Sequence, residues 1–216
     1  QGRAMRALSR QVMGQLELRR AVIDLEQAAG ERRRQIEQLD EYGRRLEAAL
    51  ALAAERSLTD ALTGARNRLA FADRLEAEMR RHRRYRTRLT LALMDVDHFK
   101  EYNDRFGHLA GDEALRRVVQ ILMKGARAAD LLARFGGEEF ALILPDTPLE
   151  GGLVVAERLR RAIAAAPWPQ APITVSVGVA GVENNPADAD GLIASADRAL
   201  YEAKTAGRNR VVLAGP

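Results

Sequence analysis

The sequence has no cysteine among its 216 residues, which excludes a disulfide framework and a thiolate metal site. Lysine is also scarce: it occurs only as Lys100, Lys124 and Lys204, so nearly all the positive charge is arginine. No apolar run approaches the roughly 20 residues that a membrane-spanning helix needs, and no secretory signal opens the chain. These absences predict a cytoplasmic protein. Residue 1 is Gln rather than Met, so we expect a fragment, and membrane tethering of a longer parent chain stays open.

Hydrophobic residues make up 47% of the sequence, enough for a buried core, and the length suits one domain with an accessory segment. The net charge is only +4 with both signs interspersed, which argues against a dedicated nucleic-acid binder. The densest basic stretch consists of the arginines between residues 80 and 88. We interpret it as a solvated helix end rather than a nucleic-acid patch.

The first 56 residues carry a heptad pattern. Ten of the fourteen a and d positions in one register are apolar, over seven heptads without proline or interruption. This length and phase predict a dimerising coiled coil over residues 1–56, and a long helix packed on its own domain is the alternative. Four positions weaken the seam, namely Gln11, Gln15, Arg32 and Gly43. These positions would either fix the register of the coiled coil or allow the coiled coil to switch between states, and the sequence does not separate the two.

A second region follows a turn-forming segment at residues 57–60 and continues to residue 216. Its apolar periodicity alternates between helical and strand-like segments. We expect helices over residues 67–87, 112–125, 148–165 and 189–206, and strands over residues 89–95, 131–135, 140–144, 173–180 and 211–213. This order predicts an α/β domain of about 155 residues, in which helices flank a sheet.

Two acidic clusters lie where strands meet turns. Asp95 and Asp97 end a buried apolar run, and Glu138 and Glu139 follow two glycines at the tip of a predicted hairpin. Carboxylate oxygens suit Mg²⁺, which binds few protein ligands and completes its shell with substrate phosphates. Acidic pairs are common on surfaces, so either cluster alone is weak evidence. Together with glycines that allow close backbone approach, they predict a metal–nucleotide site.

Residues 136–140 read GGEEF and resemble the motif that names the GGDEF family of diguanylate cyclases. Other stretches between residues 57 and 214 resemble further motifs of the family at their usual spacing. They are Asp60–Arg68 (with Ala65 where the family usually has leucine), Asp95–Lys100, Asn103–Asp104, Phe106–His108, Gly111–Glu113 and Ala203–Asn209. The resemblance implies a sheet similar to the palm of nucleotidyl cyclases and polymerases.

The resemblance also implies a reaction that joins two GTP molecules into cyclic di-GMP and releases two pyrophosphates. Each 3′-hydroxyl would attack the α-phosphorus of the other nucleotide, with metal ions stabilising the in-line displacement. Carried over by position, Asp95, the Val96 carbonyl and Glu138 should hold Mg²⁺, with Mn²⁺ as the alternative. Glu138 is also a candidate general base, although a carboxylate bound tightly to metal is a poor proton acceptor. Glu139 and Asp97 are secondary acidic candidates.

The family's phosphate contacts map onto two segments. Lys100 should stabilise charge in the transition state, assisted by the backbone N–H groups of Phe99 and Lys100 at a helix start. Lys204 and Arg208 should bind the terminal phosphates.

The family's base contacts map onto residues 103–112. Asn103 and Asp112 should read the guanine edge, because a carboxylate accepts from guanine N1–H and N2–H₂, whereas adenine offers no such donor pair. His108 either lines the nucleotide pocket or is an ordinary structural histidine.

An inhibitory site is implied at Arg127 and Asp130, with Arg158 as a third contact. Arginine and aspartate together can address the guanine edge and the phosphates of the product. Outside a family motif, an arginine and an aspartate three residues apart more often form an ordinary surface contact. The position in the family motif is what favours cyclic di-GMP as an allosteric ligand as well as the product.

One domain would hold one GTP, so the implied reaction needs two domains face to face. A homodimer joined by a parallel coiled coil would supply the partner domain, with a sensor domain expected upstream. Two rival functions stay open: a catalytically silent domain that binds cyclic di-GMP, and a related transferase that uses ATP to make a mixed dinucleotide. A coiled-coil scaffold alone would explain the first quarter of the chain but not the acidic clusters.

Overall fold

The computed structural model divides the chain into two compact units, Gln1–Arg56 and Ser57–Pro216. The structure describes Arg32, Gln38, residues 40–45, Ala53, residues 58–182 and residues 188–215. In the first unit, residues 40–45 are helical, and Arg45 forms an ion pair with Glu41 one turn earlier. Most of the heptad positions lie outside the described residues, so the coiled coil of residues 1–56 stays a prediction.

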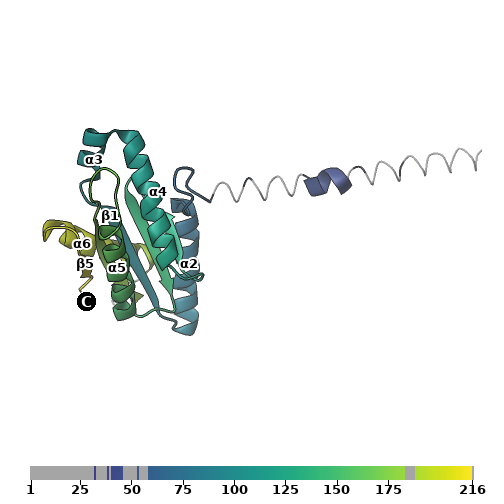
Figure 1. Ribbon diagram of the computed structural model, residues 1–216. Coiled ribbons are helices and arrows are strands. Elements are labelled where there is room, and N and C mark those ends of the chain that lie inside the picture. The colour runs from purple at the N-terminus through teal and green to yellow at the C-terminus, as the bar shows by residue number, and fades with distance from the viewer. Residues whose placement is uncertain are drawn as a thin grey trace, which may run out of the picture. The chain divides into compact units, whose positions relative to one another are not determined.

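The second unit is built on a five-stranded sheet with the order β2-β3-β1-β4-β5 (Figure 1). The central strand, β1, is antiparallel to both of its neighbours, and β4 is parallel to β5. The strands are β1 (Leu89–Val96), β2 (Leu131–Arg134), β3 (Glu139–Pro145), β4 (Val175–Gly181) and β5 (Val211–Leu213). The end of β1 therefore lies between the β2–β3 hairpin and β4.

Helices cover both faces of the sheet (Figure 1). The helices of this unit are α2 (Arg68–Tyr85), α3 (Phe99–Phe106), α4 (His108–Gly125), α5 (Leu149–Ala164) and α6 (Ala189–Thr205). α2 and α6 bury one apolar cluster against the sheet, and α4 and α5 bury another on the opposite face. The predicted α/β architecture is confirmed. No helix among the described residues has the length and apolar character that crossing a membrane requires.

Side chains alternate along β1 between the two cores. Met94 and Val96 pack in the cluster with α4 and α5, whereas Leu93 packs in the cluster with α2 and α6. A strand buried on both faces reads as a continuous apolar run, which is why β1 was recognisable in the sequence. By the same alternation, Asp95 projects toward the side of the sheet that α6 covers.

The close approach of α6 to β4 depends on Gly178. A Cβ at this position would lie 2.1 Å from the backbone oxygen of Ala196 and 2.2 Å from the backbone nitrogen of Leu200. Only a residue without a side chain lets the helix lie this near the strand. The contact brings the last turn of α6, which carries Lys204, toward the end of the central strand.

One predicted boundary is wrong. The apolar pattern predicts a helix that starts at Asp112, but α4 begins at His108, directly after the separate helix α3. Gly107 joins the two helices with a φ of 85°, a conformation that glycine adopts without strain. Asp112 therefore lies one turn inside α4, where this helix packs against α3, and not at a helix start.

Candidate functional site

Two carboxylates from distant parts of the sequence meet at one end of the sheet. Asp95 is a buried residue near the end of β1, and Glu138 lies at the tip of the β2–β3 hairpin. The strand register places Asp95 opposite Glu139, and the Val96 N–H donates to the Glu138 carbonyl over 3.2 Å. Because burial of the strand faces fixes this register, it brings the hairpin tip beside the end of β1.

The two acids affect each other electrostatically. Burial raises the pKa of Glu138 above its ordinary value, and the negative charges of Asp95 and Glu139 raise it further. Burial also raises the pKa of Asp95, although a hydrogen bond from Lys204 acts in the opposite direction. Like charges held close together and partly out of water favour a cation beside them.

Helix α6 and the turn after it supply positive charge. The Lys204 Nζ lies 2.8 Å from Asp95 Oδ2. Arg208 lies near enough for its charge to lower the pKa of Asp95, a smaller effect than that of Lys204. The structure thus brings both predicted contacts for terminal phosphates to the carboxylate that is predicted to hold the metal.

The donor set fits a small, hard cation. The Asp95 and Glu138 carboxylates and the Val96 carbonyl offer oxygen atoms only, the ligand type that Mg²⁺ prefers. Within the described ranges, no group of three or more His, Asp and Glu side chains could hold a metal ion alone. These residues therefore suit Mg²⁺ that arrives with a phosphate ligand and takes part of its shell from that ligand.

A second part of the site lies where α3 packs against α4. The Asn103 Oδ1 atom is buried and has no hydrogen-bond partner in the described part of the chain. Gly111 makes room for it, because a Cβ there would lie 1.8 Å from this oxygen. Asp112, the next residue, is half-buried. A buried acceptor without a partner costs about 1–3 kcal/mol, so this pocket suits a ligand that donates hydrogen bonds.

The start of α3 exposes backbone donors. Phe99 and Lys100 form its first turn, and His98 precedes them in a left-handed conformation without a side-chain cap. The first N–H groups of a helix have no partner within it. Lys100 is exposed there, and His108 is exposed at the start of α4, which does not match a buried structural histidine.

Asp97, predicted as a secondary acidic candidate, is tied to the protein by three hydrogen bonds. The hydroxyl groups of Thr174 and Ser176 donate to its carboxylate over 2.7 and 2.6 Å. The Asn209 N–H donates to it as well, over 3.1 Å. With both oxygens engaged and the residue buried, Asp97 serves as a structural acceptor.

Arg134, which was not predicted from the sequence, holds the hairpin tip. Its Nε and Nη2 donate to the Gly137 carbonyl over 3.0 and 2.6 Å, and its Nη1 donates to both carboxylate oxygens of Asp60. Burial raises the pKa of Asp60, but hydrogen bonds from Thr63 and Arg134 outweigh it and leave the pKa below its ordinary value. One guanidinium thus connects the turn at residue 60 with the residue before Glu138.

The predicted inhibitory residues surround one turn between α4 and β2. The Arg127 N–H donates to Asp130 Oδ2 over 2.7 Å, and the Asp130 N–H donates to the Arg127 carbonyl over 3.0 Å. Arg158 of α5 donates to the Gly125 carbonyl over 2.7 Å. The three residues therefore lie close together, with the Arg127 and Arg158 residues exposed.

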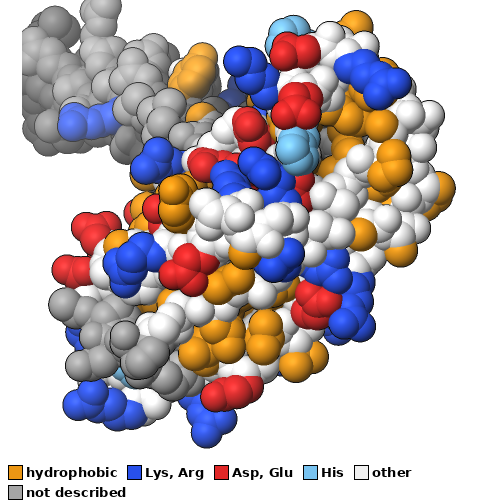
Figure 2. Space-filling view, turned by 90° about the vertical axis from the view of Figure 1, so that its left-hand side faces the viewer, with side chains coloured by type: hydrophobic (Ala, Val, Ile, Leu, Met, Phe, Trp, Pro, Cys, Tyr) orange, Lys and Arg blue, Asp and Glu red, His pale blue; other side chains and the backbone are white. Residues whose placement is uncertain are grey.

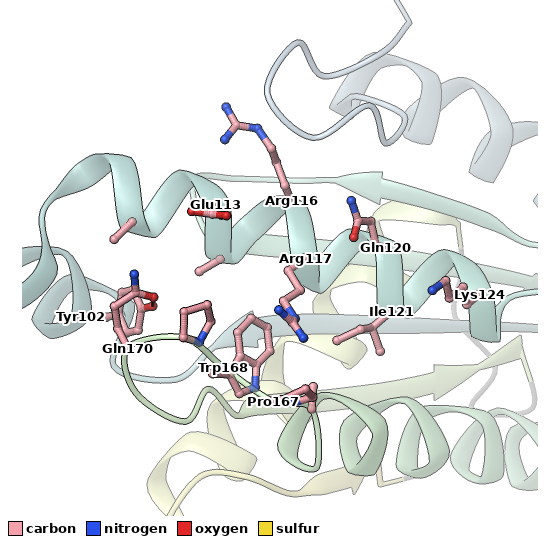
Figure 3. Close-up of a pocket in the computed structure, with 14 residues that line it drawn as sticks. Tyr102, Glu113, Arg116, Arg117, Gln120, Ile121, Lys124, Pro167, Trp168 and Gln170 are labelled. Carbon is pink, nitrogen blue, oxygen red and sulfur yellow. Dashed lines mark hydrogen bonds between the residues drawn. The ribbon is translucent and has the colours of Figure 1, made fainter.

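A groove of about 600 Å³ lies between α4 and the loop at residues 166–170 (Figure 3). Arg117 extends toward Trp168, with its guanidinium carbon 5.5 Å from the ring centroid, whereas Arg116 points away from the groove (Figure 3). The residues that line the groove include none of the predicted catalytic or nucleotide-binding residues. Cavity size alone would therefore not locate the carboxylate pair.

Charge on one face of the molecule is mixed. Figure 2 shows Lys and Arg side chains interspersed with Asp and Glu rather than gathered into one basic stripe. The full sequence has the same mixture of signs, with 34 Lys and Arg residues against 30 Asp and Glu residues.

The carboxylate pair, the neighbouring cations and the five-stranded sheet match a known family. A family profile described as "Diguanylate cyclase, GGDEF domain" matches residues 57–210. The chain belongs to the GGDEF family. The GGDEF match covers the second compact unit and every predicted site residue.

Curated relatives share this GGDEF domain but are much longer. Diguanylate cyclase DgcP of Pseudomonas aeruginosa is 49% identical over 164 residues, which cover 74% of this chain and 24% of that protein. Diguanylate cyclase DgcM of Escherichia coli is 43% identical over 172 residues, which cover 79% of this chain and 41% of that protein. The chain thus spans less than half the length of these relatives.

Solved GGDEF structures share the fold. The coiled coil and GGDEF domain of DgcB from Caulobacter crescentus, in complex with c-di-GMP, gives a TM-score of 0.78 at 31% identity, over 83% of this chain and 97% of that chain. The active GGEEF domain of a diguanylate cyclase from Vibrio cholerae gives 0.67 at 32% identity, over 69% of this chain and 97% of that chain. These likenesses confirm the mixed α/β architecture.

Proposed function

We propose that this GGDEF protein is a diguanylate cyclase, which condenses two GTP molecules into cyclic di-GMP and releases two pyrophosphates. The observation that carries the proposal is the meeting of Asp95 and Glu138 at one end of the sheet, with Lys204 against them. The curated names of DgcP and DgcM support the same activity. A silent domain that only binds cyclic di-GMP would not need this pair of acids with a cation beside it.

Asp95, the Val96 carbonyl and Glu138 are the proposed ligands of Mg²⁺ or Mn²⁺. When bound, the metal would neutralise phosphate charge and assist the in-line displacement. Glu138 is the proposed acceptor of the proton from the 3′-hydroxyl, with Glu139 as the neighbouring acid. A carboxylate bound tightly to the metal accepts protons poorly, so these two roles of Glu138 compete.

Four residues are proposed to hold the triphosphate. Lys100 forms no ion pair with any described side chain and is exposed, so it can contact the phosphates where negative charge develops. The N–H groups of Phe99 and Lys100, in the uncapped first turn of α3, would donate to phosphate oxygens. Lys204, which lies against Asp95, and Arg208 would contact the terminal phosphates.

Asn103 and Asp112 are proposed to select guanine, with His108 at the rim of the pocket. The Asn103 Oδ1 atom and the Asp112 carboxylate are acceptors, and guanine presents N1–H and N2–H₂ donors on one edge. Adenine has only its N6 amino group as a donor on this edge and presents an acceptor at N1, so it cannot satisfy both acceptors, which disfavours the transferase that uses ATP.

The active form is proposed to be a homodimer, because the product contains two nucleotides and each domain would bind one. The coiled coil predicted for residues 1–56 would hold two domains at high effective concentration. The DgcB structure, which contains a coiled coil with its GGDEF domain, supports this arrangement. The greater length of the curated relatives agrees with a sensor domain in a longer parent chain, and we keep the cytoplasmic location as part of the proposal.

The central experiment is chromatography of the nucleotides after incubation with GTP and Mg²⁺. We expect cyclic di-GMP from the wild type and none from Glu138→Ala, while the control Glu150→Ala at the exposed start of α5 retains the activity. Added ATP should neither compete with GTP nor enter the product. If the wild type leaves GTP unchanged but binds cyclic di-GMP, the silent binding domain is the correct function.

We also propose that cyclic di-GMP inhibits the enzyme at Arg127, Asp130 and Arg158. The compact turn that Arg127 and Asp130 form with each other leaves the two arginines exposed for guanine or phosphate contacts. Arg127→Ala should relieve product inhibition without lowering the initial rate, whereas Arg198→Ala on α6 should not relieve it. An Arg127→Ala enzyme that is still fully inhibited contradicts this assignment.

A further inference from the structure

We infer that Asp97 positions the phosphate-binding turn after α6 and thereby sets the preference of the site for a triphosphate over a monophosphate. The inference rests on the proposed use of GTP, because it concerns the residues that would hold the terminal phosphates. Asp97 is then a positioning residue, which acts through Arg208 and Lys204 and does not contact the nucleotide.

The turn after α6 has an unusual backbone. Gly207, Arg208 and Asn209 have successive φ values of 108°, 59° and 46°. Residues other than glycine adopt the left-handed region at a cost, so two of them in sequence persist only where the surrounding structure holds them. The Arg208 N–H donates back to the Ala203 carbonyl over 3.0 Å, which starts the turn but does not fix its later residues.

Asp97 provides the contact that holds Asn209 at the end of β1, while the next residue, Arg210, accepts from the Val177 N–H of β4 over 2.9 Å. The Asn209 N–H donates to Asp97 Oδ2, and the Asn209 side-chain oxygen accepts from Arg160 of α5. Asp97 is itself held by hydroxyl groups from Thr174 and Ser176 beside it. A buried carboxylate that accepts three hydrogen bonds forms a rigid link between the end of β1 and the backbone of the turn.

This link sets the distance between the phosphate contacts and the metal ligand. Asp97 directly follows β1, and Ser176, which donates to it, lies opposite Asp95 in the sheet register, so the two aspartates lie close together. Arg208 directly precedes the anchored Asn209, and its charge reaches Asp95. Without the anchor, the strained turn can relax and carry Arg208 away from the site. Asn103 lies on α3, where it packs against α4, and would keep its affinity for guanine.

Asp97→Ala tests the inference, since it removes both acceptor oxygens and with them the contact to the Asn209 N–H. We expect GTP to bind about tenfold more weakly in calorimetric titrations with Mg²⁺, as for one lost charge-assisted hydrogen bond. The affinity for GMP should stay within about twofold of wild type. The matched control is Ser176→Ala, which removes the hydroxyl from the other carboxylate oxygen and leaves the Asn209 contact intact, so its ratio of GTP to GMP affinity should equal that of wild type. An equal loss for both nucleotides in Asp97→Ala, or no loss for either, would overturn the inference.

Hydrogen exchange of the wild-type chain provides a second measurement, which does not depend on a variant that folds. The Asn209 amide should be protected to the same degree as amides within β4, although Asn209 is exposed in a turn. Unprotected exchange of this amide would overturn the inference that Asp97 anchors the turn. If the wild type binds no GTP, the proposed function fails, but the protection of Asn209 still supports or overturns the positioning role of Asp97.

Discussion

At the scale of a single residue, Gly111 shapes the site because it has no side chain. A methyl group there would lie 1.8 Å from Asn103 Oδ1 and 3.1 Å from Phe99 Cζ, so the asparagine would have to turn away. We expect Gly111→Ala to weaken GTP binding about tenfold, equivalent to roughly 1.4 kcal/mol for one hydrogen bond to the base. Calorimetric titration with GTP measures this change.

A double-mutant comparison controls this prediction. In a chain that already carries Asn103→Ala, the additional Gly111→Ala change should cost little, because the hydrogen bond is already lost. An equal loss with and without Asn103 would show that Gly111 acts on the helix packing and not through the asparagine.

Glu157 on α5 gives a prediction on pH. The hydrogen bond from Arg160 lowers its pKa to about 2, and Arg161 adds to this effect. The folded-state pKa lies below the ordinary value of 4.5, so the stabilisation is fully present above pH 4.5 and is lost as the pH falls toward 2. Because the group is partly exposed, we expect Glu157→Gln to lower the free energy of unfolding by only about 1 kcal/mol at pH 7.

Urea unfolding at pH 7 and pH 3 measures this contribution. The difference between Glu157→Gln and wild type should shrink at the lower pH, whereas the exposed control Glu202→Gln should differ little from wild type at either pH. A difference that is as large at pH 3 as at pH 7 would mean that Glu157 stabilises the fold by packing and not by charge.

At the scale of elements, Arg134 at the end of β2 ties the β2–β3 hairpin to Asp60, which lies outside it. Its guanidinium bridges Asp60 and the Gly137 carbonyl, so it restrains the tip that carries Glu138. We expect Arg134→Gln to reduce kcat about tenfold and to leave the affinity for GMP unchanged, because the guanine pocket lies on other elements. Initial rates and GMP titrations measure the two effects separately.

The conservative variant is the control for this bridge. Arg134→Lys keeps the charge but not the forked set of donors, so it should recover only part of the activity. Hydrogen exchange at residues 136–138 should accelerate in both variants. Normal kcat together with a loosened hairpin would show that the restraint has no role in the chemistry.

The elements that could be predicted from the sequence are those with a strong local pattern. The apolar run of β1 and the two glycines of the hairpin have such patterns, and so do the longer helices. The short helix α3 does not, since it contains five charged or amide residues in eight, and Gly107 could equally end a loop. The start of α4 at His108 was therefore missed.

The candidate site was predictable to a similar extent. The motif positions located the acids and ranked Asp97 behind Asp95, but the sequence did not show what Asp97 contacts, because the two aspartates have the same chemistry and lie two residues apart. The distinction comes from Thr174 and Asn209, which lie 77 and 112 residues away in the chain. Arg134 was missed for the same reason, since its partner Asp60 is 74 residues away.

At the scale of the whole molecule, the proposed reaction depends on two domains meeting. Deleting residues 1–56 should lower the rate of product formation at dilute protein while leaving GTP binding intact, because only the effective concentration of the partner domain changes. Rates measured over a range of protein concentrations test this. At high concentration the shortened chain should approach the rate of the full chain, and equal rates at dilute protein would contradict a role for the first unit in dimerisation.

The central position of β1 makes the two acids that are proposed to bind the metal unequal in mobility. Asp95 belongs to the interior of the sheet, where opening requires much of the domain to unfold, whereas Glu138 lies in the hairpin turn, which can open locally. The distance between the two carboxylates therefore changes only when Glu138 moves. Any contact that stiffens or displaces that turn would change turnover while leaving the melting temperature of the domain almost untouched.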